Sequence, residues 1–193
     1  MKIIITESQF KRLIENIILE SDSKRKEFID ILNQENISYE INNDNKIIIG
    51  GRNIYSKLIT YIPDNVVFNN DDYVYFPFLK GVGNNIVFNN NGYVDLPSLK
   101  EMGNNIKFNN DGYVYFPFLK GVGNNIIFNN KDNVWLTSII WFNINSVNFT
   151  NNVGDVYFGK ELFWMNEFPY QIYNIKGNFK MWNDKKDEWE IIK

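Results

Sequence analysis

Asp95 and Glu101 are the acidic residues whose placement first suggests chemistry. Each occurs in one copy of a repeated segment and is absent from the matching position of the other copies. Two carboxylates can serve as general acid and general base, as they do in glycosidases and in some lyases. Nothing in the sequence indicates a cleft between these two side chains, so we expect no catalysis from them.

Other catalytic arrangements are excluded by composition. The chain of 193 residues contains no His and no Cys. This removes thiolate nucleophiles, Ser-His and Cys-His arrangements, disulfides and Cys-ligated zinc or iron–sulfur sites. Gly81-Val82-Gly83 lacks the Lys-Ser/Thr or the third Gly of a phosphate-binding loop. We therefore predict a protein that is not an enzyme and that uses no cofactor.

Charged residues also recur at fixed intervals. The acids in predicted turns are Asp71, Asp72, Asp111 and Asp132. Asp is common in turns for conformational reasons, and the spacing lacks a calcium-binding repeat, so we expect no metal site. The basic row is Lys80, Lys100 and Lys120. Like charges at this spacing repel each other, so the row either faces solvent, which we favour, or meets an acidic partner.

Recognition is the chemistry that the remaining residues favour. Some positions vary between copies of the repeat while their neighbours stay constant, which is typical of an exposed working surface. Outward aromatic side chains on a rigid sheet are good centres for protein binding. The alternative is that these rings only cover the fold and stack on one another. The candidate partner-binding residues are Tyr75, Asp95, Tyr115, Trp135, Phe78, Phe118 and Lys107.

These residues belong to a repeat with a period of 20. Successive copies begin at Asn65, Asn85, Asn105 and Asn125 without gaps, a weaker copy covers 45–64, and 147–158 resembles a further copy with one inserted residue. Positions that do not vary between copies should form the core. The constant columns are Phe68, Phe88, Phe108 and Phe128; Val74, Val94, Val114 and Val134; Leu79, Leu99, Leu119 and Ile139; and Val66, Ile86, Ile106 and Ile126.

Each copy reads as strand, turn, strand, corner and bend. Asn89-Asn90 and Gly92 have the chemistry of a turn, because Asn and Gly tolerate positive φ and Asn side chains cap turns. Stacked Asn side chains could also hydrogen-bond between copies. One copy cannot bury its apolar face alone, so about six copies must stack as rungs about 4.8 Å apart.

The segment LPSLKEMGNNIKFNN, from Leu96 to Asn110, resembles the short 20-residue leucine-rich repeats of bacteria and is similar to repeat proteins predicted in bacteriophage genomes. The resemblance covers roughly residues 45–158 and implies a solenoid. The opening MKIIITESQFKRLI is also similar to phage-encoded proteins. A rival interpretation makes each copy a β-hairpin around Asn91-Gly92, as in choline-binding modules, but those modules are rich in Trp.

The two ends should cap the solenoid. Thr6-Glu7-Ser8-Gln9 forms a capping box, and apolar spacing predicts one helix over 7–20 and a second over 23–33, followed by strands over 37–41 and 46–49. We expect an α+β protein with an N-terminal helical cap (1–44), a β-rich solenoid (45–158) and an aromatic β-rich C-terminal cap (159–193). Trp164, Trp182 and Trp189 lie in that last segment.

Function is expected to follow from binding. The net charge of −3 argues against nucleic acid as a partner, and no membrane segment is expected. The resemblance to phage proteins implies a cytoplasmic protein that inhibits or redirects a host protein, as anti-CRISPR proteins do. The alternatives are a structural or virion-associated adhesion protein and a module that binds carbohydrate or another small ligand. Two solenoids could also form a homodimer by pairing an exposed edge.

Overall fold

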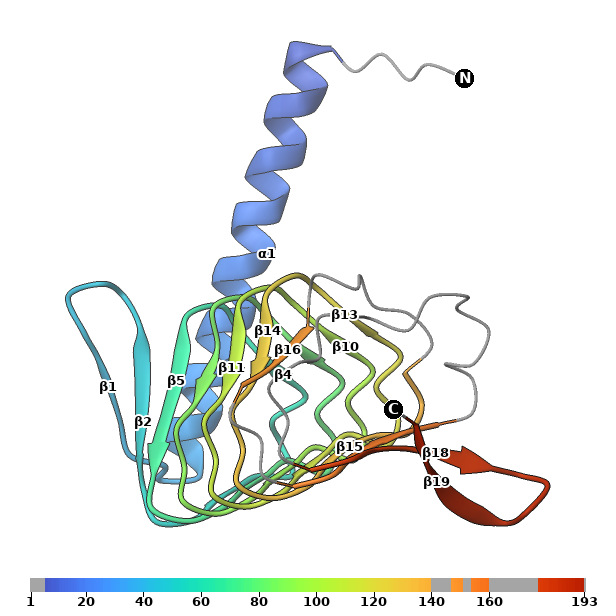
Figure 1. Ribbon diagram of the computed structural model, residues 1–193. Coiled ribbons are helices and arrows are strands. Elements are labelled where there is room, and N and C mark those ends of the chain that lie inside the picture. Colours follow the sequence, from blue (N-terminus) through green and yellow to red (C-terminus); the bar gives the residue numbers. More distant parts are fainter. Residues whose placement is uncertain (1–5, 140–146, 151–153, 160–176, 193) are drawn as a thin grey trace.

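The chain folds as a parallel β-solenoid of about five turns, with one helix before it and a β-hairpin after it (Figure 1). The computed structural model describes residues 6–139, 147–150, 154–159 and 177–192. Each turn contributes short strands to three sheets, termed A, B and C. The predicted β-solenoid with a helical N-terminal cap is thus confirmed, while the closer likeness to leucine-rich repeats and the count of six rungs stay predictions.

The sheets run along the solenoid, and their strands are short. In spatial order, sheet A contains β1 (Tyr39–Ile41), β2 (Ile47–Gly51), β5 (Val66–Asn70), β8 (Val87–Phe88), β11 (Ile106–Phe108), β14 (Ile126–Phe128) and β16 (Val147–Phe149). Sheet B contains β19 (Glu188–Ile192), β18 (Phe179–Asn183), β17 (Val156–Phe158), β15 (Val134–Leu136), β12 (Val114–Tyr115), β9 (Val94–Asp95), β6 (Val74–Tyr75) and β3 (Ile54–Tyr55). Sheet C contains β13 (Gly121–Val122), β10 (Glu101–Met102), β7 (Gly81–Val82) and β4 (Tyr61–Ile62).

Parallel pairing fixes the 20-residue register. Phe88 pairs with Phe68 on one side and with Phe108 on the other, and Val94 pairs with Val74 and Val114 in the same way. Strands β8 and β9, on either side of Asn91-Gly92, belong to different sheets. The alternative of separate β-hairpins is therefore wrong, because the partner of each strand lies one period away.

The core consists of the predicted columns. All sixteen of those side chains are buried, with at most 1% of any of them exposed. Phe88 stacks on Phe68 at 4.8 Å and on Phe108 at 4.9 Å between ring centroids, with nearly parallel planes. Repetition of one ring at one place thus produces a continuous aromatic stack inside the coil, with each ring in the offset or parallel contact that aromatic pairs favour.

Asn side chains tie successive rungs together, as predicted. Asn110 Nδ2 donates to Asn90 Oδ1 at 2.7 Å inside the coil, and Asn90 Nδ2 donates to Gly92 O at 3.1 Å. The expected positive φ falls elsewhere. Among the described residues it is found at the Asn that begins each copy, such as Asn85 (φ 58°) and Asn105 (φ 58°), and not at Gly92.

Glycine allows the backbones of neighbouring rungs to lie close together. A Cβ built on Gly103 would lie 2.4 Å from the carbonyl oxygen of Gly83, one rung away. No side chain fits at that distance without moving the backbone of the neighbouring rung. At Gly92, which the sequence placed in a turn, a Cβ would lie 2.7 Å from the carbonyl carbon of Asp72, so close approach and not positive φ explains that glycine as well.

The N-terminal segment forms one helix, α1 (Glu7–Gln34), where two were predicted. Thr6 Oγ1 accepts from the Gln9 N–H, and Gln9 Oε1 accepts from the Thr6 N–H, which confirms the capping box. The expected break near Ser23 is absent because no Gly or Pro interrupts the segment. Lys24 also forms an ion pair with Glu20 at 2.7 Å across the supposed junction.

The C-terminal half of α1 covers the first turn of the solenoid. Phe28 and Leu32 are fully buried against the coil. Lys24 Nζ lies 4.7 Å from the centre of the Tyr61 ring, and Arg25 donates to the carbonyl oxygen of Asn45 at 2.9 Å. The antiparallel pair β1 and β2 extends this end of sheet A, as expected from the apolar runs around an Asn-rich turn.

At the other end, β18 and β19 form an antiparallel hairpin, and β18 pairs in parallel with β17. Trp182 and Trp189 face each other across it. Trp164, which the sequence assigned to the C-terminal cap, lies outside the described residues.

Candidate functional site

The outward face of sheet B carries a column of large side chains. Parallel pairing places one residue of each rung in register with the next, so a single position in the repeat becomes a line along the solenoid. The column is Tyr55, Tyr75, Asp95, Tyr115, Trp135, Tyr157 and Lys180. Asp95 is the only acid among these seven residues, and it stands in the middle of an aromatic series.

The rung that contains Asp95 differs in sequence from the two rungs beside it, which are identical to each other over 13 residues. Residues 73–85 and 113–125 have one and the same sequence, whereas 93–105 departs from it. Asp95 stands where the neighbours have Tyr75 and Tyr115, and Ser98 stands where they have Phe78 and Phe118. Two outward aromatic side chains are thus missing from one rung, and Leu96 replaces a third, buried ring that the neighbours have as Phe76 and Phe116.

This arrangement defines a surface that we call the aromatic notch. Its floor is Asp95 and Ser98, and its walls are Tyr75, Tyr115, Phe78 and Phe118. In the neighbouring column, the ring centroid of Tyr93 lies 5.0 Å from that of Tyr73 and 4.8 Å from that of Tyr113. These distances give the spacing between successive rungs. The walls are two rungs apart, or about 10 Å, so the gap between them is about the space of one missing ring.

The floor of the notch is polar and partly desolvated. Asp95 Oδ1 is buried and has no hydrogen-bond partner among the described residues. Burial raises the pKa of the Asp95 carboxyl to about 6. Ser98 Oγ donates to the carbonyl oxygen of Pro77 at 2.6 Å, so its hydroxyl is fixed on the rung beside it. An ionised Asp95 therefore lacks the donor that a shielded carboxylate requires.

The two Phe walls of the notch are exposed. Phe78 is 53% exposed and Phe118 is 60% exposed, although each ring belongs to a regular repeat and neither rests in the core. Tyr75 and Tyr115 are half-buried. Large apolar side chains in solvent next to an unpaired carboxylate form a surface suited to a ligand with apolar and cationic parts.

Five of the seven predicted residues come together at the notch, and two do not. Trp135 stacks on Tyr157 with ring centroids 3.7 Å apart and contacts Trp189 of the C-terminal hairpin edge-on at 5.9 Å. That ring is a contact between the coil and its cap. Lys107 lies on β11 in sheet A, which is a different side of the solenoid.

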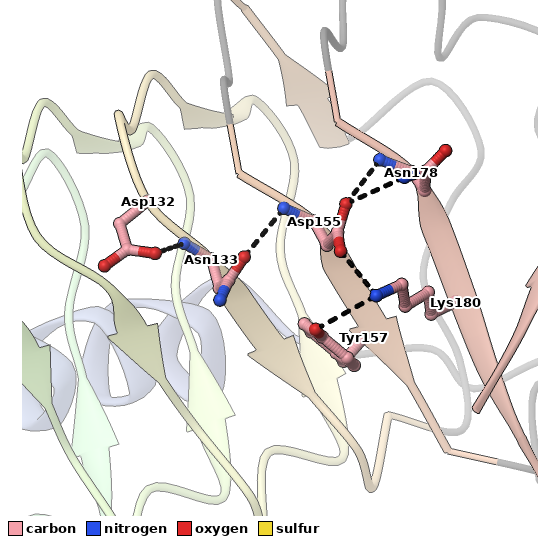
Figure 2. Close-up of polar contacts among 6 residues, drawn as sticks. All are labelled: Asp132, Asn133, Asp155, Tyr157, Asn178 and Lys180. Atoms are coloured by element: carbon pink, nitrogen blue, oxygen red, sulfur yellow. Dashed lines mark hydrogen bonds and ion pairs between the residues drawn. The ribbon is translucent and has the colours of Figure 1, made fainter. Parts of the chain in front are cut away.

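Figure 2 shows how the hairpin is attached beyond Trp135. Asp155 accepts from the Asn178 N–H at 2.8 Å and pairs with Lys180 Nζ at 2.6 Å, and its own N–H donates to Asn133 Oδ1. Lys180 Nζ also lies 3.4 Å from the Tyr157 hydroxyl. Burial acts to raise the pKa of Asp155, but hydrogen bonds from Lys180 and Asn178 outweigh it and hold the pKa below its usual value.

Comparison of the copies also identifies Ser98 as a varying position, in one column with Phe78 and Phe118, although the predicted binding residues do not include it. Sequence reasoning did not single out the stack of Tyr73, Tyr93 and Tyr113 as part of a site. The Tyr stack does not vary between these rungs, so it carries no such signal, and only the structure places it beside Asp95. The field of Asp95 contributes, after burial, to raising the pKa of Tyr113 to about 12.

The remaining charged groups form no comparable site. Lys80, Lys100 and Lys120 are exposed, in the place expected for a solvated row. Asp111 pairs with Lys131 of the next rung at 2.6 Å. Within the described ranges, no three acidic, His or Cys side chains are grouped so that they could hold a metal ion, and no helix has the length and apolar character needed to cross a bilayer.

Comparisons of the chain with protein-family models, with curated proteins and with solved structures give no match. The candidate site therefore rests on the geometry of the notch.

Proposed function

We propose that this protein is a non-catalytic binding module whose aromatic notch receives a segment of another protein. The observation that supports this most directly is the replacement of Tyr and Phe by Asp95 and Ser98 between two identical rungs. A column that served only to cover the coil would gain contacts by repeating the aromatic residues, as its neighbours do. The departure lowers the packing of the rung and leaves a shielded carboxylate unpaired, which is the pattern of a position kept for binding.

The chemistry of the notch favours a basic side chain of the partner. A Lys or Arg stem is apolar and would lie between the Tyr75 and Tyr115 rings, while its charged end would pair with Asp95. Phe78 and Phe118 would then contact apolar residues beside that basic side chain. Burying the ion pair between Asp95 and the partner's basic side chain raises affinity only where further hydrogen bonds satisfy both groups. The contact would therefore contribute to specificity as much as to affinity.

The consequence of binding that we propose is the one implied by the resemblance to phage repeat proteins. The module would occupy a surface of a host protein and block or redirect it in the manner of an anti-CRISPR protein. A sugar could also stack on exposed rings beside an acid, and this makes carbohydrate binding the second candidate function.

The test fills the notch without disturbing the fold. The double substitution Asp95→Tyr with Ser98→Phe restores the two outward aromatic residues of the flanking rungs, so it should leave the solenoid intact. Lys107→Val, a matched replacement on sheet A, is the control. Each protein would be used as bait in lysate of the proposed host cells. Glycan arrays would be probed with the same three proteins. Retained proteins would be identified by mass spectrometry.

A protein retained in stoichiometric amount by the wild type and by Lys107→Val, but lost by the filled notch, would support the proposal. Equal retention by all three baits would place binding elsewhere, and retention by none would contradict protein binding. Glycan binding that is lost on filling the notch would favour the second candidate.

A further inference from the structure

The columns beside the notch show what one rung of this solenoid holds between two flanking rings. The Tyr93 ring lies between those of Tyr73 and Tyr113, with centroids 5.0 and 4.8 Å apart and planes tilted by 5° and 1°. The buried Phe column is stacked in the same way, with planes tilted by 1° and 6° on either side of Phe88. Each rung therefore accommodates one flat ring, stacked on the ring before it and on the ring after it.

In the notch that flat ring is missing, and its two neighbours remain. Asp95 occupies the place of the ring, in register between Tyr75 and Tyr115. Tyr75 already stacks on Tyr55 of the preceding rung, with centroids 5.6 Å apart and planes tilted by 29°. Its other face is therefore directed toward the rung of Asp95. The notch is a slot about one ring thick, with an aromatic residue on each side.

The floor of the slot offers hydrogen-bond acceptors. No described residue donates to the shielded Asp95 Oδ1. The Ser98 hydroxyl donates its single proton to the carbonyl oxygen of Pro77 at 2.6 Å, so its oxygen can only accept from a ligand. Because burial raises the pKa of Asp95 to about 6, its carboxylate is ionised at neutral pH. The group that suits this floor carries a positive charge and several N–H donors.

The same outward column already holds a cation on a ring at its far end (Figure 2). Lys180 Nζ lies 5.2 Å from the centre of the Tyr157 ring and pairs with Asp155 at 2.6 Å. The Tyr157 ring also stacks on Trp135, at 3.7 Å between centroids. A basic side chain, a ring and a carboxylate thus occur together in this column. Among the described residues that ammonium lies over a single ring, whereas a guest in the slot would have a ring on each side.

We infer that the slot selects the guanidinium of an Arg over the ammonium of a Lys. This inference rests on the proposed function, in which a partner segment places a basic side chain in the notch. A guanidinium is flat, stacks on aromatic faces and presents five N–H donors in its plane. Lying parallel to Tyr75 and Tyr115 at about 5 Å from each ring, it takes the place of the missing ring and directs donors to Asp95.

A Lys ammonium fits the slot less well. It is compact and strongly hydrated, so it loses more hydration on entering and contacts less of each ring face. Its three donors point in different directions, so they cannot all meet the floor formed by Asp95 and Ser98. A neutral planar group has the shape of the missing ring but no charge to pair with Asp95. Among the side chains that are fully charged at neutral pH, the guanidinium is the flat cation.

The experiment compares three blocked peptides that differ in one side chain. Acetyl-Leu-X-Leu-amide carries Arg, Lys or citrulline at X, and its apolar residues can contact Phe78 and Phe118. Citrulline has the flat shape of Arg without the charge. Each peptide is titrated into the full chain, and NMR shift changes of the Asp95 and Ser98 amides report binding at the notch. We expect the Arg peptide to bind about tenfold more tightly than either of the others.

Variants separate the flat shape of the slot from its charge. Tyr75→Leu removes one ring, so it should bring the affinities for the Arg and Lys peptides close to each other. Tyr115→Leu should do the same from the other side and serves if the first variant does not fold. Asp95→Asn should weaken both charged peptides and leave the citrulline peptide unchanged. The control Lys107→Val, on sheet A, should bind all three peptides as wild type does.

Equal affinities of the Arg and Lys peptides for wild type would overturn the inference. They would leave the proposed function standing, because the notch would still bind a basic side chain. A preference for Arg that is unchanged in a folded Tyr75→Leu would also overturn it, since stacking would then not be its cause. If no peptide shifts the notch amides, the inference fails as well, and the pull-down with the filled notch decides separately whether the notch binds another protein.

Discussion

Asp95 pairs in register with Tyr75 across β9 and β6, so a carboxylate and a phenol ring share one column on the outside of sheet B. The next rung returns to Tyr115 in the same register. An acid between two aromatic residues interrupts contacts that the repeat otherwise continues. The resulting free-energy cost can be measured, and it separates a binding role from a packing role.

Replacing Asp95 by Tyr should stabilise the protein. The substitution adds a ring between Tyr75 and Tyr115, where aromatic pairs contribute ~0.5–1.5 kcal/mol, and removes a shielded oxygen without a partner. We expect a gain of about 1 kcal/mol, or roughly 2–4 °C in Tm for a chain of this size. Thermal unfolding followed by circular dichroism measures it. A loss of stability would mean that Asp95 makes a structural contribution and would weaken its assignment to a binding site.

Asp95 should also make stability depend on pH. Burial raises its pKa from 3.8 to about 6, so the folded state holds a proton that the unfolded state releases between these values. Above about pH 6 the folded protein therefore bears the full free-energy cost of the buried Asp95 carboxylate. The free energy of unfolding rises as the pH falls from about 6 toward 4. Because the group is half exposed, we expect an effect of about 1 kcal/mol.

Denaturant unfolding at neutral and mildly acidic pH would measure this effect as a difference between wild type and Asp95→Asn. The variant keeps the shape of the side chain but cannot titrate, so subtracting it removes the contribution of the other carboxyl groups. A difference between the two proteins that does not change with pH would show that Asp95 titrates normally.

The repeat made much of this fold predictable. A constant residue at one position, such as Phe108 with its copies, can occupy only a shared environment, and the structure places the whole column in the core. The single helix was not predicted, because Ser21-Asp22-Ser23 is compatible both with a cap and with the middle of a helix. The contact between Glu20 and Lys24 favours the second, and it depends on a geometry that the sequence alone does not show.

The site was predictable in part for a similar reason. Comparison of copies identifies which positions vary, and it identified Asp95 and Tyr115 correctly as neighbours in one column. It does not tell which sheet a strand joins, so Lys107 was grouped with residues on another side of the coil. The contact of Trp135 with Trp189 was not predictable, because the C-terminal strand lies far along the chain and the repeat gives no sign that it packs there.

Close approach between rungs predicts a clear difference between two glycines. Gly103→Ala would bring a methyl group to 2.4 Å from the carbonyl oxygen of Gly83, so the rungs must separate locally. Overpacking of this kind costs ~1–3 kcal/mol. Gly50→Ala is the control, because its added methyl group meets nothing within 4 Å, and we expect no loss of stability there. Equal effects of the two substitutions, measured by denaturant unfolding, would contradict close approach as the reason for Gly103.

Phe108 and Phe118 provide the sharpest separation of structure from binding, since they lie ten residues apart in one rung. Phe108 is fully buried in the aromatic stack, and Phe118 is 60% exposed at the notch. We expect Phe108→Ala to lower the free energy of unfolding by ~3–5 kcal/mol, and Phe118→Ala to change it by less than ~0.5 kcal/mol. For partner binding we expect the opposite order. In protein that is still folded, Phe118→Ala should weaken binding more than Phe108→Ala, because only the Phe118 ring is exposed to a ligand. Measuring both unfolding and binding of Phe118→Ala is decisive: a variant as stable as wild type that also binds as tightly would remove this wall from the site.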